Sequence, residues 1–340
     1  MIPPRVLLAD CDQMFVAVAR LVDPEGAGKS ALLVVGGSAQ SRGVVCSASY
    51  EVRAFGVRSG MPISRAARLC PDAMFVPVPR KACVAKSREV RAVLGEWAPA
   101  IQAASIDEFY LDLSGTEAVY RHEPLDTTAR RMRTALWERT GLRLSIGGGT
   151  NRLVAKLAAE RAKPRPNTDG TGVLIVPPGE EAAFLATHQL AEISGVGPKL
   201  QERLRKYGLV SVRDAVRVDL ADCERWLGPR TGRWLYERIR GRGGAEVDPS
   251  GEAKSISREE TFPQDLGAGE AIETELVALS SRLGADLRED ALRARVVTVK
   301  LRDFDFRTRT ASRTLDRPID SNRLIVTVAK ELLGLLRRRR

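Results

Sequence analysis

Short apolar runs alternate with amphipathic segments along the first half of the chain. Runs of apolar residues without helical spacing predict strands at 5–9, 31–37, 43–49 and 142–149. Apolar positions three and four residues apart predict helices at 14–22, 87–100, 126–141 and 150–164, the last ended by Pro164. Strands that alternate with helices indicate an α/β core built on a mixed sheet.

The pattern of apolar and polar residues changes twice in the second half of the chain. From about residue 180 the pattern is helical, and residues 241–254 are rich in glycine and charge, with Val247 as the only large apolar residue. That composition is typical of a flexible linker. Beyond it, alternating runs at 294–304 and 307–315 predict two strands, flanked by helices at 270–287 and 321–340.

One strand-like stretch, SIDEFYLDLSG at 105–115, carries two adjacent carboxylates, Asp107 and Glu108. Side chains alternate along a strand, so neighbours should point to opposite faces. If 100–104 and 109–114 form a hairpin, both acids lie at its tip, where alternation fails. Asp10, at the end of another apolar run, could then lie on a neighbouring strand of the same sheet.

Three carboxylates at one sheet edge repel each other unless cations neutralise them, and all-oxygen ligands favour Mg²⁺. Two such ions could stabilise the attacking and leaving oxygens of a phosphoryl transfer. The plainer alternative is a surface hairpin with acidic turn residues. The acids at 10 and 12, directly after a buried strand, favour the metal site.

Composition fits a soluble protein: 340 residues, 44% hydrophobic and 29% charged. The net charge of +11 indicates a polyanionic partner, or simply an arginine-rich chain. Five cysteines without C-x-x-C spacing and two histidines make a zinc site unexpected and favour a reducing cytosol. No apolar run of about 18 residues or signal peptide is evident, so neither a membrane span nor secretion is expected.

Six stretches, in this order along the chain, resemble the Y-family of translesion DNA polymerases, most closely the DinB (DNA polymerase IV) type. They are LADCDQMF, SYEVRAFGVRSGMP, SIDEFYLDLSG, SIGGGTNRLVAKLAAERAKP, ISGVGPKLQERLRKYGL and KSISREETF. The resemblance implies an α/β (α+β) multidomain fold shaped as a right hand. It places a mixed-sheet palm at 1–24 and 76–175, small fingers at 25–75, a helical thumb at 176–240, the linker at 241–254 and an α+β little finger at 255–340.

The resemblance also implies an active site. Its metal ligands and catalytic carboxylates would be Asp10, Asp107 and Glu108, with the backbone carbonyl of Cys11 as a further ligand for two Mg²⁺ ions. Asp12 would support this group, or cap the helix that follows. Ser47, Tyr50, Arg53 and Lys163 would grip the triphosphate of the incoming dNTP.

Three further residues have implied roles at the nascent base pair. Phe15 would be the steric gate that rejects a 2′-hydroxyl, with a plain core aromatic as the alternative. Val44 and Gly60 would lie over the templating pair as small groups. An open site of this kind gains little from shape discrimination, so low fidelity is expected.

The parts that hold primer–template DNA would be the thumb and the little finger. Gly195, Gly197 and Lys199 fit a helix-hairpin-helix that binds phosphate through backbone N–H groups; a simple glycine turn is the alternative. Basic residues on the last two strands would form one phosphate-facing stripe. They are Arg293, Arg295, Lys300, Arg302, Arg307, Arg309, Arg313 and Arg317.

The function so implied is template-directed, low-fidelity DNA synthesis past lesions by a monomeric bacterial enzyme, cytoplasmic and associated with the nucleoid. No segment is left over for a proofreading exonuclease. Two rivals stay open: a catalytically weak accessory DNA-binding protein, and a metal-dependent nuclease or nucleotide cyclase.

Gln13, Met14 and Ala19 depart from the family pattern, so altered activity or base preference is expected. The chain ends on a helix where the family has a further strand. The little finger is therefore expected to lack its last strand, and any tail that binds a sliding clamp is expected to be absent.

Overall fold

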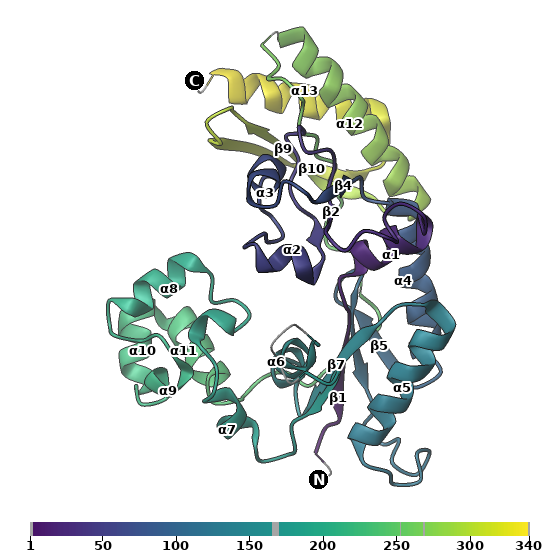
Figure 1. Ribbon diagram of the computed structural model, residues 1–340. Coiled ribbons are helices and arrows are strands. Elements are labelled where there is room, and N and C mark those ends of the chain that lie inside the picture. The colour runs from purple at the N-terminus through teal and green to yellow at the C-terminus, as the bar shows by residue number, and fades with distance from the viewer. Residues whose placement is uncertain (1–2, 165–169, 252, 268, 339–340) are drawn as a thin grey trace. The chain divides into compact units, whose positions relative to one another are not determined.

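The computed structural model describes residues 3–164, 170–251, 253–267 and 269–338 (Figure 1). The chain forms two compact units, residues 1–40 with 44–251, and residues 41–43 with 252–340. The main division falls inside the segment 241–254. The finer division of the first unit into palm, fingers and thumb stays a prediction.

A five-stranded mixed sheet forms the centre of the first unit, in the order β5-β6-β1-β7-β8. β1 is antiparallel to β6 and β7, while β7 and β8 are parallel, so the predicted mixed sheet is confirmed. The edge strand β8 was not predicted, because three residues are too few to show a pattern. The strands are β1 Val6–Cys11, β5 Ala100–Ala103, β6 Glu108–Asp112, β7 Leu144–Gly149 and β8 Val173–Ile175.

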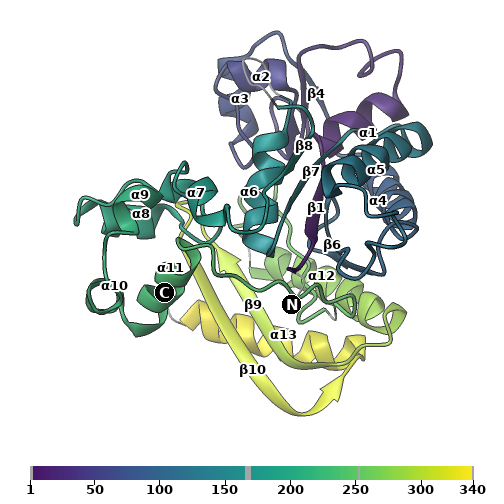
Figure 2. The same ribbon diagram turned by 90° about the horizontal axis from the view of Figure 1, so that it is seen from below.

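Alternation along β1 assigns its side chains to two different cores. Leu7 and Ala9 pack in one cluster with residues of α1 (Met14–Val22), α4 (Arg80–Leu94) and α5 (Leu125–Thr140). Val6 and Leu8 pack on the opposite face, against α6 (Arg152–Ala162). Figures 1 and 2 show α4 and α5 on one side of the sheet and α6 on the other. Asp10 shares the parity of Leu8 and therefore belongs to the face covered by α6.

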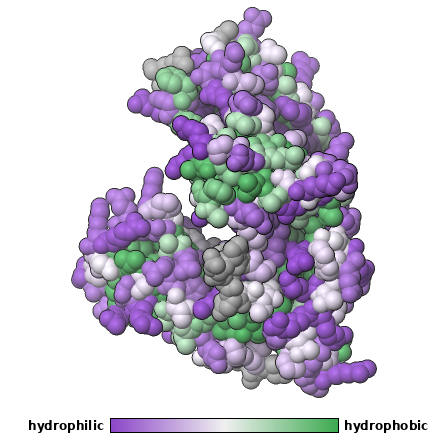
Figure 3. All heavy atoms as spheres, viewed as in Figure 1, coloured by the Kyte–Doolittle hydropathy of each residue, from purple (hydrophilic) through white to green (hydrophobic). Residues whose placement is uncertain are grey.

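A second sheet within this unit has three strands in the order β3-β2-β4. The run at 43–49 yields only a two-residue strand, and an isolated bridge joins Val44 to Pro62. Figure 3 shows hydrophobic residues gathered around α2 on an otherwise mostly hydrophilic face, and Phe55 is 52% exposed. The elements are β2 Leu33–Val35, β3 Ser47–Ala48, β4 Met74–Val76, α2 Tyr50–Ala54 and α3 Ile63–Leu69.

The helical region after β8 has its own core, which includes Leu153 and Leu157 of α6. One face of α6 therefore covers the sheet, while another joins this helical core. Its elements are α7 Glu181–Leu185, a 3-10 turn at Leu190–Glu192, α8 Pro198–Arg205, α9 Val212–Ala215, α10 Leu220–Leu227 and α11 Pro229–Arg238.

The predicted flexible linker is wrong for the part that belongs to the first unit, residues 241–251. Val247 is 8% exposed and packs with Val6 and Leu8 on the sheet. The backbone N–H of Asp248 donates to the side-chain oxygen of Gln102 at 3.2 Å. One apolar residue in a polar segment thus anchors it to the sheet, which composition alone did not reveal.

The second unit pairs β9 (Ala294–Arg302) with β10 (Thr308–Ile319) in an antiparallel ribbon. Val297 and Val299 pack against α13 (Asn322–Arg338), and α12 (Gly269–Glu289) completes the unit. These four elements match the predicted pattern. Of the terminal arginine run, Arg339 and Arg340 lie outside the described residues. Across the ranges given above, no helix is long and apolar enough to cross a membrane.

Candidate active site

The acidic stretch forms the predicted hairpin, with β5 and β6 antiparallel and a short turn between them. Asp107 lies in the turn, whereas Glu108 opens β6 and stands opposite Asp10 of β1. The expectation that both acids lie at the tip is therefore wrong for Glu108. Glu108 belongs to the strand because it pairs in register with Asp10 of β1. The N–H of Cys11 donates to the carbonyl of Asp107 at 2.9 Å, which ties the turn to β1.

Ser105 explains how two adjacent acids can serve one site. Its hydroxyl accepts from the N–H groups of Asp107 at 3.2 Å and Glu108 at 3.1 Å, and donates to the Asp107 carboxylate. Such a side-chain-to-backbone bond holds a turn in place of strand pairing. Asp107 is thereby released from the alternation that would send it to the opposite face.

Two basic residues of α6, Arg152 and Lys156, face alternate residues of β6, and Lys163 at the C-cap of α6 faces the neighbouring strand β1. Residues two apart on a strand are about 6.8 Å apart, and residues four apart on a helix rise about 6 Å, so the two rows stay in step. Sequence reasoning identified Lys163 but missed Lys156 and Arg152, although their spacing of four is visible in the sequence. The pairs are Arg152 over the Tyr110 ring at 4.3 Å, Lys156 Nζ to both Glu108 oxygens at 2.7 Å, and Lys163 Nζ to Asp10 Oδ2 at 3.0 Å.

Burial dominates the electrostatics of the carboxylate on β1. Asp10 is 8% exposed, and burial raises its pKa to about 6, against the opposing effect of Lys163. The neighbouring charges of Glu108 and Asp107 raise it further. Burial opposes the charged form of Lys163, but Asp10 and Glu160 outweigh it, so the pKa of Lys163 is raised. The site therefore holds an acid that ionises reluctantly and a lysine that stays charged.

Asp12 occupies a different position from the one that helix capping would require. The N-cap of α1 is Gln13, so the capping alternative for Asp12 is wrong. The Asp12 carboxylate instead accepts from the hydroxyl of Ser145 on β7 at 2.8 Å, and its second oxygen is buried without a hydrogen-bond partner among the described residues. Burial raises its pKa. Asp12 is thus held by β7 and not by α1.

One cavity of about 170 Å³ brings together residues from four stretches that are distant in the sequence. The four residues expected at the triphosphate line it beside all three carboxylates and Phe15. Gln13 and Met14, noted in the sequence as departures from the family pattern, also line it, as do Cys46 and Ser59, which sequence reasoning missed. The predicted residues in its wall are Asp10, Cys11, Phe15, Ser47, Tyr50, Arg53, Asp107, Glu108 and Lys163.

The start of α2, which follows β3 of the three-stranded sheet, forms another part of the cavity wall. Ser49 is the N-cap, and its hydroxyl accepts from the N–H of Val52 at 3.4 Å. This cap begins the helix at Tyr50 and sets Arg53 one turn later on the same side. The Arg53 Nε donates to the carbonyl of Ala48 at 2.9 Å, and its guanidinium lies 5.3 Å from the centre of the Tyr50 ring. Arg53 is thereby held beside the cavity.

The donor set suits a hard divalent cation, since three carboxylates and one backbone carbonyl offer only oxygen. The raised pKa of the buried Asp10 indicates that a cation near it would be stabilising. As the described side chains stand, however, no three His, Cys, Asp or Glu residues form a group that could hold one ion. Asp10 and Glu108 each face a lysine instead. The acids are thus brought to one cavity, but not to one point.

Two predicted template contacts lie outside this wall. Val44 is 48% exposed, and Gly60 donates its N–H to the carbonyl of Val45 at 2.8 Å. Gly60 has φ +81°, a left-handed backbone that disfavours any side chain, and a Cβ built there would meet no atom within 4 Å. Its glycine is required by the turn itself, whether or not a template base lies near.

The expected helix-hairpin-helix has a short first arm, a 3-10 turn, followed by the turn at 193–197 and α8. Gly195 has φ +99°, and an added Cβ would lie 2.6 Å from the Trp234 ring. Gly197 is the N-cap of α8, where the N–H groups of the first turn face outward. Lys199 is exposed on that turn.

The expected single stripe of basic residues in the last unit is wrong. Alternation along β9 puts Lys300 and Arg302 on the exposed face, opposite the buried valines. Arg295 instead alternates in step with Val297 and Val299 and belongs to their face. Arg309 donates to the carbonyl of Leu336, and Arg313 pairs with Glu331, so both reach α13 instead. The remaining three, Arg293, Arg307 and Arg317, are exposed outside the middle of the ribbon.

Family comparisons cover both units of the chain. The impB/mucB/samB family model matches residues 9–160, and the model of that family's C-terminal domain matches residues 253–340. Curated relatives include "DNA polymerase IV" of Dehalococcoides mccartyi (strain CBDB1), 35% identical over 330 residues, covering 97% of this chain and 82% of the relative. Another is "DNA polymerase IV" of Methanoculleus marisnigri, 38% identical over 331 residues, with 96% and 89% covered.

A solved structure is similar over nearly the whole chain. It is a Y-family DNA polymerase chimera of Dbh and Dpo4, with a TM-score of 0.83 and 25% sequence identity, covering 98% of this chain and 94% of that one. The likeness therefore includes both compact units.

Proposed function

The chain belongs to the impB/mucB/samB family, the Y-family DNA polymerases, and we propose that the cavity between Asp10 and Arg53 is where it joins a nucleotide to a primer. It is a DNA-directed DNA polymerase that synthesises DNA past lesions. The observation that carries the assignment of the site is that three carboxylates and four side chains with donor groups suited to phosphate line one cavity.

The chain's own groups bind and orient the two substrates. Arg53 and Lys163 would neutralise the triphosphate, the first as a planar fork and the second as a point charge. The hydroxyls of Ser47 and Tyr50 would donate to phosphate oxygens. When Lys163 engages a phosphate it releases Asp10, so nucleotide binding and the freeing of this carboxylate are coupled.

The reaction of this family requires a divalent metal, which we propose to be two Mg²⁺ ions held by Asp10, Asp107, Glu108 and the carbonyl of Cys11. Bound there, the ions would supply charge neutralisation at the triphosphate and activation of the primer hydroxyl. Lys156 holds Glu108 in the meantime and keeps a half-buried carboxylate from standing unpaired.

Selection of the sugar and the base would fall to the other walls. Phe15, on the first turn of α1, would lie beneath the sugar and exclude a 2′-hydroxyl. The exposed Val44 and the side-chain-free Gly60 would leave the space over the nascent pair open, which fits synthesis across altered bases.

Backbone contacts to primer–template DNA would come from two regions. The N-terminus of α8, with Gly197 and Lys199, offers N–H groups and a positive charge to a phosphate. Lys300, which pairs with Glu259, and Arg302 lie on the exposed face of β9 and would offer two cations there. Neither set reads base edges, so affinity should depend on salt more than on sequence.

A primer-extension assay tests the site. The intact chain with Mg²⁺ and dNTPs should extend a primer, and the double variant Asp107→Ala/Glu108→Ala should not, while it keeps its DNA affinity. Full extension by that variant would refute the assignment. We further propose a monomer that acts in the bacterial cytoplasm; sedimentation tests the first point.

A further inference from the structure

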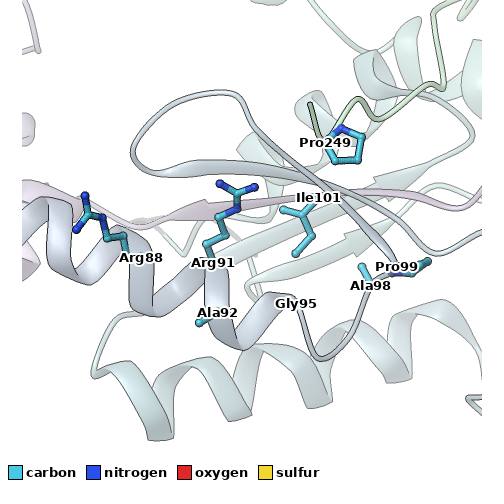
Figure 4. Close-up of a pocket in the computed structure, with 8 residues that line it drawn as sticks. All are labelled: Arg88, Arg91, Ala92, Gly95, Ala98, Pro99, Ile101 and Pro249. Atoms are coloured by element: carbon cyan, nitrogen blue, oxygen red, sulfur yellow. The ribbon is translucent and has the colours of Figure 1, made fainter. Parts of the chain in front are cut away.

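A groove on the far side of the catalytic sheet has no part in the reaction described above. It measures about 500 Å³ and lies between the end of α4, the start of β5 and residue 249. Its wall consists of small or apolar residues with two arginines (Figure 4). These residues are Arg88, Arg91, Ala92, Gly95, Ala98, Pro99, Ile101 and Pro249.

The two arginines are the only charged residues in this wall. Both are exposed, and no hydrogen bond or ion pair from a described residue reaches either guanidinium. The nearby acid Glu89 is paired with Lys86 instead. Figure 4 shows both guanidinium groups on the same side of α4, with Arg91 directed toward Ile101 and Pro249. The groove therefore presents positive charge that the described part of the chain leaves unneutralised.

The strand beside the groove has a free edge. β5 ends the five-stranded sheet and pairs only with β6. Within the described ranges, no other segment forms a hydrogen bond with the backbone of Ala100–Ala103. Unpaired N–H and C=O groups on an edge strand can accept a further strand from another chain.

We propose that this groove binds an extended, acidic segment of a partner protein, which adds to the edge of β5 and places its carboxylates on Arg88 and Arg91. Residues three apart on a helix have Cβ atoms about 5–6 Å apart, close to the spacing of alternate residues on a strand. Two acids of the partner segment separated by one residue would therefore match Arg88 and Arg91. Ala98, Ile101 and Pro249 would contact the apolar residues of the same segment. Two cations among six uncharged residues suit a peptide better than a nucleic acid, which needs a broader basic surface.

The test measures anisotropy of a fluorescein-labelled octapeptide that alternates valine with aspartate, added to the full chain. This peptide should bind about tenfold more tightly than the same peptide with asparagine in place of aspartate. Arg88→Glu/Arg91→Glu should lower its affinity about tenfold or more. Ala92→Trp, which fills the groove without changing charge, should lower it as well. Primer extension should be retained in both variants, which shows that they fold and separates this site from the catalytic one.

The matched control is Arg80→Glu/Lys81→Glu, which makes the same change in net charge on exposed positions of α4 outside the groove. It should leave peptide affinity unchanged. Equal binding of both peptides, or equal loss in the control variant, would overturn the proposal. So would an oligothymidylate that displaces the peptide and loses affinity only in the Arg88/Arg91 variant, since nucleic acid would then be the occupant. A dimer that only this variant disrupts would make a second copy the occupant.

Discussion

Gly147→Ala should displace the helix that carries both lysines of the active site. Gly147 lies in β7 on the face covered by α6. A Cβ built there would be 1.9 Å from the backbone nitrogen of Ala159 and 2.3 Å from the backbone oxygen of Ala155. The first distance is about 1.5 Å short of ordinary contact at 3.4 Å. Helix backbone atoms cannot rotate away as a side chain can, so α6 must shift as a body.

That shift has two measurable costs. Overpacking of a core typically costs about 1–3 kcal/mol, and a contact with backbone belongs at the upper end of that range. Moving Lys156 and Lys163 by about 1 Å should lower kcat/KM for dNTP incorporation about 100-fold. Urea unfolding gives the first quantity, and single-nucleotide primer extension gives the second.

Gly148→Ala is the matched control, one residue along the same strand. Its added Cβ would meet Ile175 Cδ1 and Leu7 Cδ2, both at 2.6 Å, which are the ends of flexible side chains on the opposite face of the sheet. It should cost less stability and leave kcat/KM within a few-fold of the parent. If the two alanine variants lose equal activity, the reasoning about α6 is refuted.

Four further outcomes are expected. Lys156→Met should lower primer extension about tenfold or more, because it leaves a half-buried carboxylate unpaired, and Lys156→Arg should lose less. Phe15→Ala should raise ribonucleotide insertion relative to deoxyribonucleotide insertion about tenfold or more, measured by competition. The pKa of Asp10 is about 6 in the folded protein, against 3.8 when it is exposed. The folded state therefore loses stability as the pH rises from about 4 to 6, by a total of about 3 kcal/mol. In metal-free urea unfolding, Asp10→Asn should gain stability relative to the parent across that range. Lys300→Ala/Arg302→Ala should reduce the slope of log affinity against log salt by about 2.

The last three of these outcomes each have a contrary result. Unchanged sugar selection would make Phe15 a plain core aromatic. A stability difference between the parent and Asp10→Asn that does not vary with pH would mean that burial does not hold the proton on Asp10. For the ribbon, Arg309→Ala/Arg313→Ala removes the same charge from side chains that reach α13. If both double variants reduced the slope of log affinity against log salt equally, the face of the ribbon on which a cation lies would not decide whether it contacts DNA.

Local pattern predicted most of the elements that build the site. Apolar runs and helical spacing predicted β1, β7, α1 and α6 close to their bounds, because each is set by period and ended by local signals such as Pro164. The adjacent acids at 107 and 108 indicated the hairpin turn, because two neighbouring acids do not fit the alternation of a strand. The residue types also predicted an oxygen-only metal site and a phosphate grip.

Tertiary structure decided which of these residues meet. Lys156 pairs with Glu108 because a helix row and a strand row keep step across the sheet, a relation between segments 48 residues apart that no local period contains. The burial of Val247 depends on a sheet formed by distant strands. The alternation of side chains along β9 can be seen in the sequence. Which of its two faces is exposed depends on α13, which covers Val297 and Val299. Sequence determines period and chemistry, while packing between distant segments determines which face is buried and which charges are paired.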